Sequence, residues 1–133
     1  MVFEYPLLIV ERHLDTFGHV NNATYLEIFE EARWDFIEKN GYGHHQIMSI
    51  GEGPVVLEVT LKFLKEMRLR EHIVVKSETV SYEGKIGKVR QWIEGPAGVM
   101  HAEAVFTMAF FDLKARKIIL PSPAWRLAIG LKD

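Results

Sequence analysis

The spacing of apolar residues changes once along this chain, and that change limits the folds open to it. From Tyr25 to Ile37 apolar residues recur at intervals of three and four, which is typical of one face of a helix. After Pro54 they alternate with polar residues in successive segments, which is typical of strands that bury one face. This order predicts an α+β fold in which a mostly antiparallel sheet is covered on one face by one long helix.

The expected elements follow one another closely, so the chain is predicted to form a single domain over residues 1–133. A strand is expected at residues 3–10, where Pro6 lacks an amide donor and favours an edge position. The helix has Asn21 or Asn22 as its N-cap and Gly41 as its C-terminal cap. Residues 41–54 are expected to form a loop. The later strands are expected at residues 55–63, 73–82, 86–94 and 99–113. Residues 124–131 are expected to form a short helix or tail.

Composition excludes several classes of partner and chemistry. A formal net charge of -2 gives no general attraction to nucleic acid or to an anionic membrane. The chain has no cysteine, which excludes disulfides, thiolate metal sites and thiol nucleophiles. The adjacent His44 and His45 lack the spacing of a metal pair, so no metal site is expected. Without an export signal or a stretch of about 18 apolar residues, a cytoplasmic location without a membrane span is expected.

The predicted sheet also carries apolar residues on the face turned away from the helix. These residues are Val74, Val80, Tyr82, Val105 and Phe111. Because exposed apolar patches of this size usually mark an interface, a partner subunit is expected to cover them.

The segment between the first strand and the helix holds the densest group of candidate catalytic side chains. Asp15 lies just before the predicted helix, whose first backbone N–H groups are unpaired and favour anionic or oxyanionic ligands. A carboxylate there can act as a nucleophile or as a base toward water, while a helix N–H polarises a carbonyl. The spacing alone favours a structural interpretation, in which Asp15 and the asparagines are caps and Gly18 forms a turn.

A resemblance to a known family favours the catalytic interpretation. The run Asp15-Thr-Phe-Gly-His-Val-Asn-Asn-Ala-Thr-Tyr25, followed by Glu30-Glu-Ala-Arg33, resembles the signature of the 4-hydroxybenzoyl-CoA thioesterase-like branch of hot-dog proteins. Within that branch it is most similar to bacterial long-chain acyl-CoA thioesterases. The resemblance implies a hot-dog fold, with a five-stranded sheet wrapped on one long central helix. It also implies a homodimer, commonly a homotetramer, with the active site at the subunit interface.

The resemblance also implies roles for individual residues. The family's catalytic aspartate falls on Asp15, and its carbonyl-polarising backbone N–H falls on Asn22. Some relatives have a histidine at the position of Asn22, so a histidine role does not transfer, and the choice between nucleophile and general base for Asp15 stays open. His19 is a third candidate, either as part of the site or as a donor to Asp15. Glu31 is a lesser alternative, because another hot-dog branch uses an acid from the helix.

The expected substrate is an acyl-CoA, held without a cofactor. Apolar side chains near Asp15 are expected to contact the acyl chain, and cations at strand ends to contact the CoA phosphates. The expected substrate-binding residues are Gly18, Asn21, Tyr25, Phe29, Phe63, Lys88 and Arg90, with Met108 a further wall residue.

The leading hypothesis is therefore hydrolysis of fatty acyl-CoA thioesters to the free acid and CoA. One alternative is a hot-dog hydratase or dehydratase, but that chemistry needs a basic histidine where this chain has Asp15. Another is a non-catalytic acyl-CoA binding module, against which the carboxylate argues.

Overall fold

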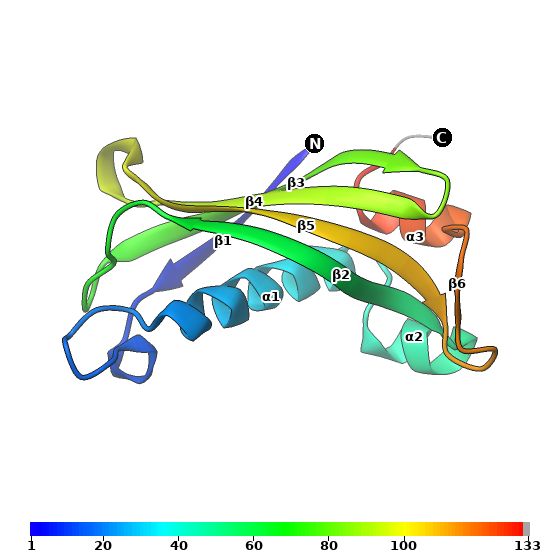
Figure 1. Ribbon diagram of the computed structural model, residues 1–133, viewed down its shortest axis with the longest axis horizontal. Helices are drawn as coiled ribbons and strands as arrows, with labels where there is room; N and C mark the ends of the chain where they lie inside the picture. Colours follow the sequence, from blue (N-terminus) through cyan, green and yellow to red (C-terminus); the bar gives the residue numbers. More distant parts are fainter. Residues whose placement is uncertain (132–133) are drawn as a thin grey trace.

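An antiparallel sheet and one long helix make up most of the structure, a computed structural model that describes residues 1–131 (Figure 1). The strands are β1 (Val2–Leu8), β2 (Glu52–Phe63), β3 (His72–Glu83), β4 (Ile86–Glu94), β5 (Met100–Asp112) and β6 (Lys117–Ile119). The helices are α1 (Asn22–Lys39), α2 (His44–Ile50) and α3 (Pro123–Ala128), with 3₁₀ turns at Glu11–His13 and Pro96–Gly98. The sheet has the order β1-β3-β4-β5-β2, β6 pairs with β5, and every pairing is antiparallel.

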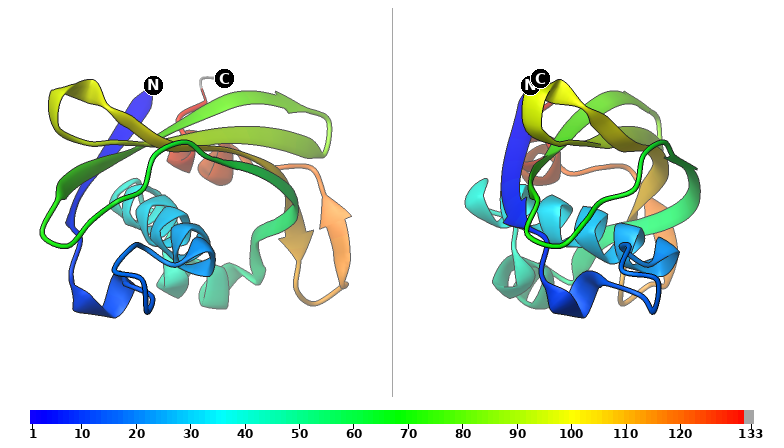
Figure 2. Two further views of the ribbon diagram at one scale, coloured as in Figure 1. Left: turned by 60° about the vertical axis from the view of Figure 1, so that its left-hand side comes forward. Right: turned by 90° about the vertical axis from the view of Figure 1, so that its left-hand side faces the viewer.

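The sheet curves over α1, as Figure 2 shows. The predicted α+β architecture, with one long helix against a wrapped antiparallel sheet, is therefore confirmed. The helix begins after Asn21, whose side chain accepts a hydrogen bond from the backbone N–H of Ala23 at 2.9 Å. It ends before Gly41, which has the left-handed φ of +91° that suits glycine. Pro6 lies on β1, an edge strand, as the missing amide donor predicts.

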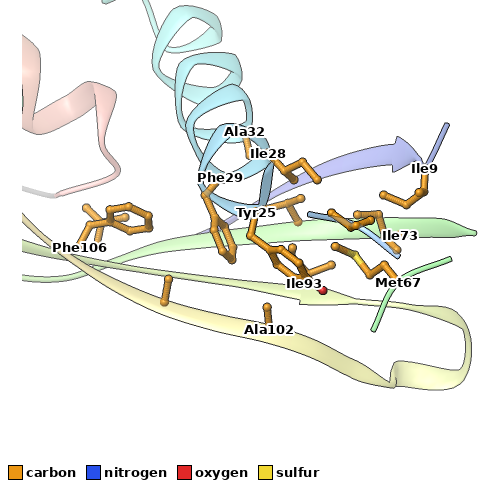
Figure 3. Packing of buried hydrophobic residues seen from close by; sticks show 14 of the residues in the cluster. Ile9, Tyr25, Ile28, Phe29, Ala32, Met67, Ile73, Ile93, Ala102 and Phe106 are labelled. Carbon is orange, nitrogen blue, oxygen red and sulfur yellow. The ribbon is translucent and has the colours of Figure 1, made fainter. Parts of the chain in front are cut away.

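The face of α1 that repeats every three to four residues is buried against the sheet. Tyr25, Ile28, Phe29 and Ala32 pack on residues of β3, β4 and β5 (Figure 3). The Phe29 ring meets the edge of the Phe106 ring at a centroid distance of 5.9 Å. Burying a side chain of this size stabilises a fold by about 1.5–3 kcal/mol, so this face anchors the start of the helix.

Two short elements differ from the sequence-based expectation. The segment expected as a loop contains α2, and the chain beyond β5 contains β6, so the sheet has a sixth strand within the described residues. α2 has seven residues and none is buried, so it leaves no periodic apolar signal. Its start is stabilised locally, because Gly43 N–H donates to Gln46 Oε1 at 3.0 Å. Three residues are likewise too few to show the alternation of a strand.

The prediction that Tyr82 lies on the outer face of the sheet is wrong, because β3 contains a bulge. Thr79 pairs with Val89 but Ser81 pairs with Lys88, so Val80 is an extra residue between them. The extra residue reverses the alternation beyond it. Tyr82 consequently packs in the helix-side cluster with Phe36 and Trp125 and not on the outer face. Val80 and Val105 do lie exposed on the strands, at 59% and 36% of their full surface.

Candidate active site

The loop between β1 and α1 folds back on itself like a small hairpin. Leu14 forms an isolated bridge with Val20, and the Asp15 N–H donates to the His19 carbonyl at 2.8 Å. The tip is a turn in which the Gly18 N–H donates to the Asp15 carbonyl at 3.2 Å. Gly18 has φ +82°, a conformation that side-chain-bearing residues rarely adopt. Gly18 thus shapes the loop that carries Asp15.

The Asp15 carboxylate is held by this loop and does not cap the helix. Its Oδ1 atom accepts hydrogen bonds from the backbone N–H groups of Phe17 at 2.8 Å and His19 at 3.2 Å. Within residues 1–131, no hydrogen bond or ion pair engages its Oδ2 atom. The capping alternative for Asp15 is therefore wrong, because Asn21 is the cap. One carboxylate oxygen is fixed and the other is available.

The helix start lies next to this carboxylate and offers a free donor. Asn21 is the N-cap and Asn22 is the first helical residue. The N–H of a first helical residue has no partner inside the helix, and no hydrogen bond of the described residues uses that of Asn22. The Asn21 N–H is occupied, since it donates to the His13 carbonyl at 3.1 Å. Asn22 therefore has the position that the resemblance assigned to it.

His13 supports both the loop and the helix start. It is buried, and its Nδ1 atom accepts a hydrogen bond from the Val10 N–H at 2.9 Å. Burial lowers the pKa of the His13 imidazole, and the charge of Arg12 lowers that pKa further, while the Glu31 carboxylate acts in the opposite direction. The fold thus favours the neutral ring, which keeps Nδ1 an acceptor.

This histidine should make stability depend on pH. Because its pKa is lower in the folded state, the unfolded chain binds the proton more readily. The stabilisation is complete above the unfolded value of about 6.5 and is lost as the pH falls below it through the folded pKa. The melting temperature should fall between neutral and mildly acidic pH, and we expect this fall to be smaller in His13→Asn. Asparagine keeps a hydrogen-bond acceptor but does not titrate. The exposed His72→Asn variant is the control, and an equal flattening in both variants would contradict the assignment.

One cavity of about 500 Å³ brings most of the predicted site residues together. Asp15, His19, Asn21, Asn22, Tyr25 and Phe63 all line it. The Tyr25 and Phe63 rings meet edge to face, with centroids 4.9 Å apart, and form an apolar wall. The cavity therefore joins a carboxylate, a helix start and an apolar surface.

Four further lining residues were not predicted from the sequence. They are Val20, Leu64, Lys65 and Glu66. The Glu66 Oε2 atom lies 2.9 Å from His19 Nε2, and its Oε1 atom accepts a hydrogen bond from Arg68 at 2.7 Å. The bond from Arg68 holds the pKa of the Glu66 carboxyl below its usual range, with the His19 ring acting in the same direction. His19 therefore contacts Asp15 through its backbone, while its ring pairs with Glu66.

Other predicted residues lie elsewhere. Phe29 is fully buried in the core and does not line the cavity, and Met108 lies in that core too. Lys88 and Arg90 alternate along β4 with Val89 and Gln91, which face α1, so they lie on the opposite face of the sheet. There Lys88 Nζ donates to Thr107 at 2.6 Å, and Arg90 pairs with Glu103 at 2.7 Å. The structure thus does not bring these two cations into the cavity.

Within residues 1–131, no group of three or more His, Asp or Glu side chains is placed to hold a metal ion. No helix in this part of the chain combines the length and apolar character needed to span a membrane.

Comparisons with known proteins identify relatives of this chain. The model of the thioesterase-like superfamily matches residues 11–129. The long-chain acyl-CoA thioesterase FadM of Escherichia coli is 34% identical over 80% of this chain and 81% of its own. The crystal structure of YbaW, a probable thioesterase from Escherichia coli, has a TM-score of 0.83 at 29% identity and covers 94% of both chains. A Staphylococcus aureus protein solved in complex with CoA shares the fold, with a TM-score of 0.90 at 16% identity over 98% of this chain and 82% of its own.

Proposed function

The chain belongs to the thioesterase-like superfamily of hot-dog proteins and is a thioester hydrolase, and we propose that it cleaves fatty acyl-CoA to the free acid and CoA. The observation that carries this proposal is the single cavity shared by Asp15 and the first turn of α1. It supplies a carboxylate and a free backbone donor on the same side of the fold. The name of FadM, a long-chain acyl-CoA thioesterase, supports the choice of substrate.

In the proposed reaction the thioester carbonyl accepts a hydrogen bond from the Asn22 N–H. This bond strengthens as negative charge develops on the oxygen, so it lowers the barrier. The Asp15 carboxylate then either attacks the carbonyl carbon or removes a proton from an attacking water. In both routes the carbon–sulfur bond breaks and the CoA thiolate takes up a proton. Direct attack leaves a mixed anhydride between the acyl group and Asp15, which water must then hydrolyse to release the acid and restore the carboxylate. A single turnover in ¹⁸O-labelled water tests for this anhydride, because its hydrolysis at the Asp15 carbonyl labels Asp15 and not the acid, whereas the general-base route labels only the acid.

The cavity walls suit the two parts of an acyl-CoA. Tyr25, Phe63 and Leu64 offer apolar surface to the acyl chain. Lys65 is the cation that lines the cavity, and we assign it to a CoA phosphate in place of Lys88 and Arg90. Glu66 and Arg68 are already paired with each other beside it. We therefore expect Lys65→Ala to raise KM for acyl-CoA more than it lowers kcat.

A homodimer is part of this proposal. β2 is an edge strand of twelve residues, and edge strands of that length are usually paired or covered. Along it Val56, Leu57 and Phe63 are 45%, 48% and 53% exposed. Phe63 also lines the cavity with Asp15, so a subunit covering this edge closes the active site. Pairing of two dimers into a homotetramer stays a prediction.

The direct test is release of free CoA, followed with a thiol dye. We expect activity on a panel from acetyl-CoA to palmitoyl-CoA to rise with chain length, because the cavity wall is apolar and aromatic. One benzoyl-type thioester tests the aromatic alternative. Hydration of crotonyl-CoA without thiol release would instead overturn the proposed function.

A further inference from the structure

Arg33 is a buried cation that forms no ion pair within the described part of the chain. It lies on α1 with only 7% of its surface exposed. Its guanidinium lies 4.3 Å from the centre of the Phe106 ring, and its Nη1 atom donates to Gln91 Oε1 at 3.0 Å. Both partners are neutral, so they orient the group without balancing its charge.

Burying this charge without an ion-pair partner lowers the stability of the isolated subunit. Burial lowers the pKa of the Arg33 guanidinium from its usual value to about 10, while the charge of Glu30 on the same helix acts in the opposite direction without forming an ion pair with it. Buried charges in proteins are normally paired with an opposite charge or with a metal. Arg33 is buried on the central helix and bonded only to neutral groups, which indicates that an anion approaches it from outside the subunit.

A second cavity shows from which side that anion comes. It has a volume of about 280 Å³ and lies between α1 and the edge strand β2. Arg33, Glu30 and Trp34 line it from α1, and Pro54 and Val56 line it from β2. It shares no lining residue with the cavity that holds Asp15. A CoA phosphate or a product carboxylate held in the cavity of Asp15 lies outside this second cavity and is not the anion inferred here.

We propose that Glu30 of the partner subunit enters this cavity and pairs with Arg33. This inference rests on the proposed homodimer and names the contact that holds it together. Glu30 is exposed and lies one helical turn before Arg33, yet forms no ion pair with it inside the subunit. In a two-fold interface each contact occurs twice, so one Glu30 and one Arg33 per subunit satisfy each other reciprocally. The same approach covers the exposed apolar side chains of β2.

The test measures the dissociation constant of the dimer by analytical ultracentrifugation over a dilution series. Removing one partner of a buried ion pair at an interface costs at least about 30-fold in affinity, and we expect that loss for Glu30→Gln. Glu30→Arg places two cations together and should give a monomer. Both changes lie at an exposed position, so the subunit should keep its helix content. Glu83→Arg, the same charge change at the tip of the β3–β4 hairpin, should leave the dimer intact.

A double-mutant cycle gives a second, independent readout. Arg33→Lys keeps the charge but loses the planar fork, so it should also weaken the dimer. Its effect should shrink in the Glu30→Gln background, because the partner is already missing. Equal effects in both backgrounds would show that the two residues do not meet.

The outcomes separate this inference from the proposed function. A wild-type dimer that Glu30→Gln leaves equally tight would overturn the ion pair while leaving the dimer and the thioesterase intact. A lower melting temperature with an unchanged dimer would place the pair inside one subunit and also overturn it. A fully active wild-type monomer would overturn the homodimer, and the ion pair with it, but not acyl-CoA hydrolysis.

Discussion

Replacing Asp15 with asparagine should abolish most of the activity while leaving the protein folded. The Asn side-chain oxygen can accept the two hydrogen bonds from Phe17 and His19 that Asp15 Oδ1 accepts. The loop is therefore retained, but the negative charge needed by a nucleophile or base is lost. We expect kcat to fall about 100- to 10,000-fold, the usual contribution of such a group. Binding of a non-hydrolysable acyl-CoA thioether, measured by calorimetry, should persist.

The chain provides a matched control for this substitution. Asp112 is held in a similar way, since its Oδ1 atom accepts from the backbone N–H groups of Lys114 and Ala115, both at 3.0 Å. Asp112→Asn removes the same charge from a carboxylate that also accepts two backbone hydrogen bonds but does not line the cavity of Asp15. It should leave kcat nearly unchanged. Similar losses in the two variants would show that Asp15 acts through the stability of its loop and not in the reaction.

Deleting the backbone donor of Asn22 should also stop turnover without unfolding the chain. Asn22→Pro removes the N–H at the first helical position, where proline is favoured. The preceding Asn21 has φ -62° and ψ 142°, which a following proline tolerates. Helix α3 already begins with Pro123 in the same arrangement. Losing one oxyanion donor typically lowers kcat by about 100- to 1,000-fold.

Two companion variants isolate the donor from the side chain. Asn22→Ala keeps the N–H and should retain most of the activity. Asn21→Ala removes the cap and should cost about 1 kcal/mol of stability with a much smaller change in kcat. Melting temperatures should be recorded for all three variants. A folded Asn22→Pro protein with near-normal kcat would assign the polarising role to another donor, of which His19 is the next candidate.

The helix and its ends could be predicted from the sequence because their signals are local. The apolar repeat of α1, the cap at Asn21 and the left-handed Gly41 each depend on residues within a few positions of one another. The same holds for the placement of Asp15 and Asn22 at one cavity, since both flank the same helix start. The catalytic roles and the cytoplasmic location stay predictions.

Features set by contacts between distant segments could not be predicted in this way. Lys65 and Glu66 reach the site because the chain between β2 and β3 crosses the Asp15 loop, where Val20 N–H donates to the Met67 carbonyl at 3.4 Å. The periodicity of apolar residues in the sequence does not reveal where two distant segments cross. The predicted position of Tyr82 is wrong because the alternation of apolar and polar residues does not reveal a bulge in a strand. The charges of Lys88 and Arg90 suit a phosphate, but the charge of a residue does not reveal which face of the sheet it occupies.

The two backbone bonds to Asp15 Oδ1 have a consequence for the energetics of the site. They orient the carboxylate when the chain folds, so its rotational entropy is lost before any substrate arrives. Binding energy from the acyl chain then need not be spent on aligning it, and remains for the transition state. The orientation of the catalytic carboxylate therefore depends directly on the stability of this loop. Substitutions that loosen this loop, such as Gly18→Val, should lower kcat well before they lower the melting temperature.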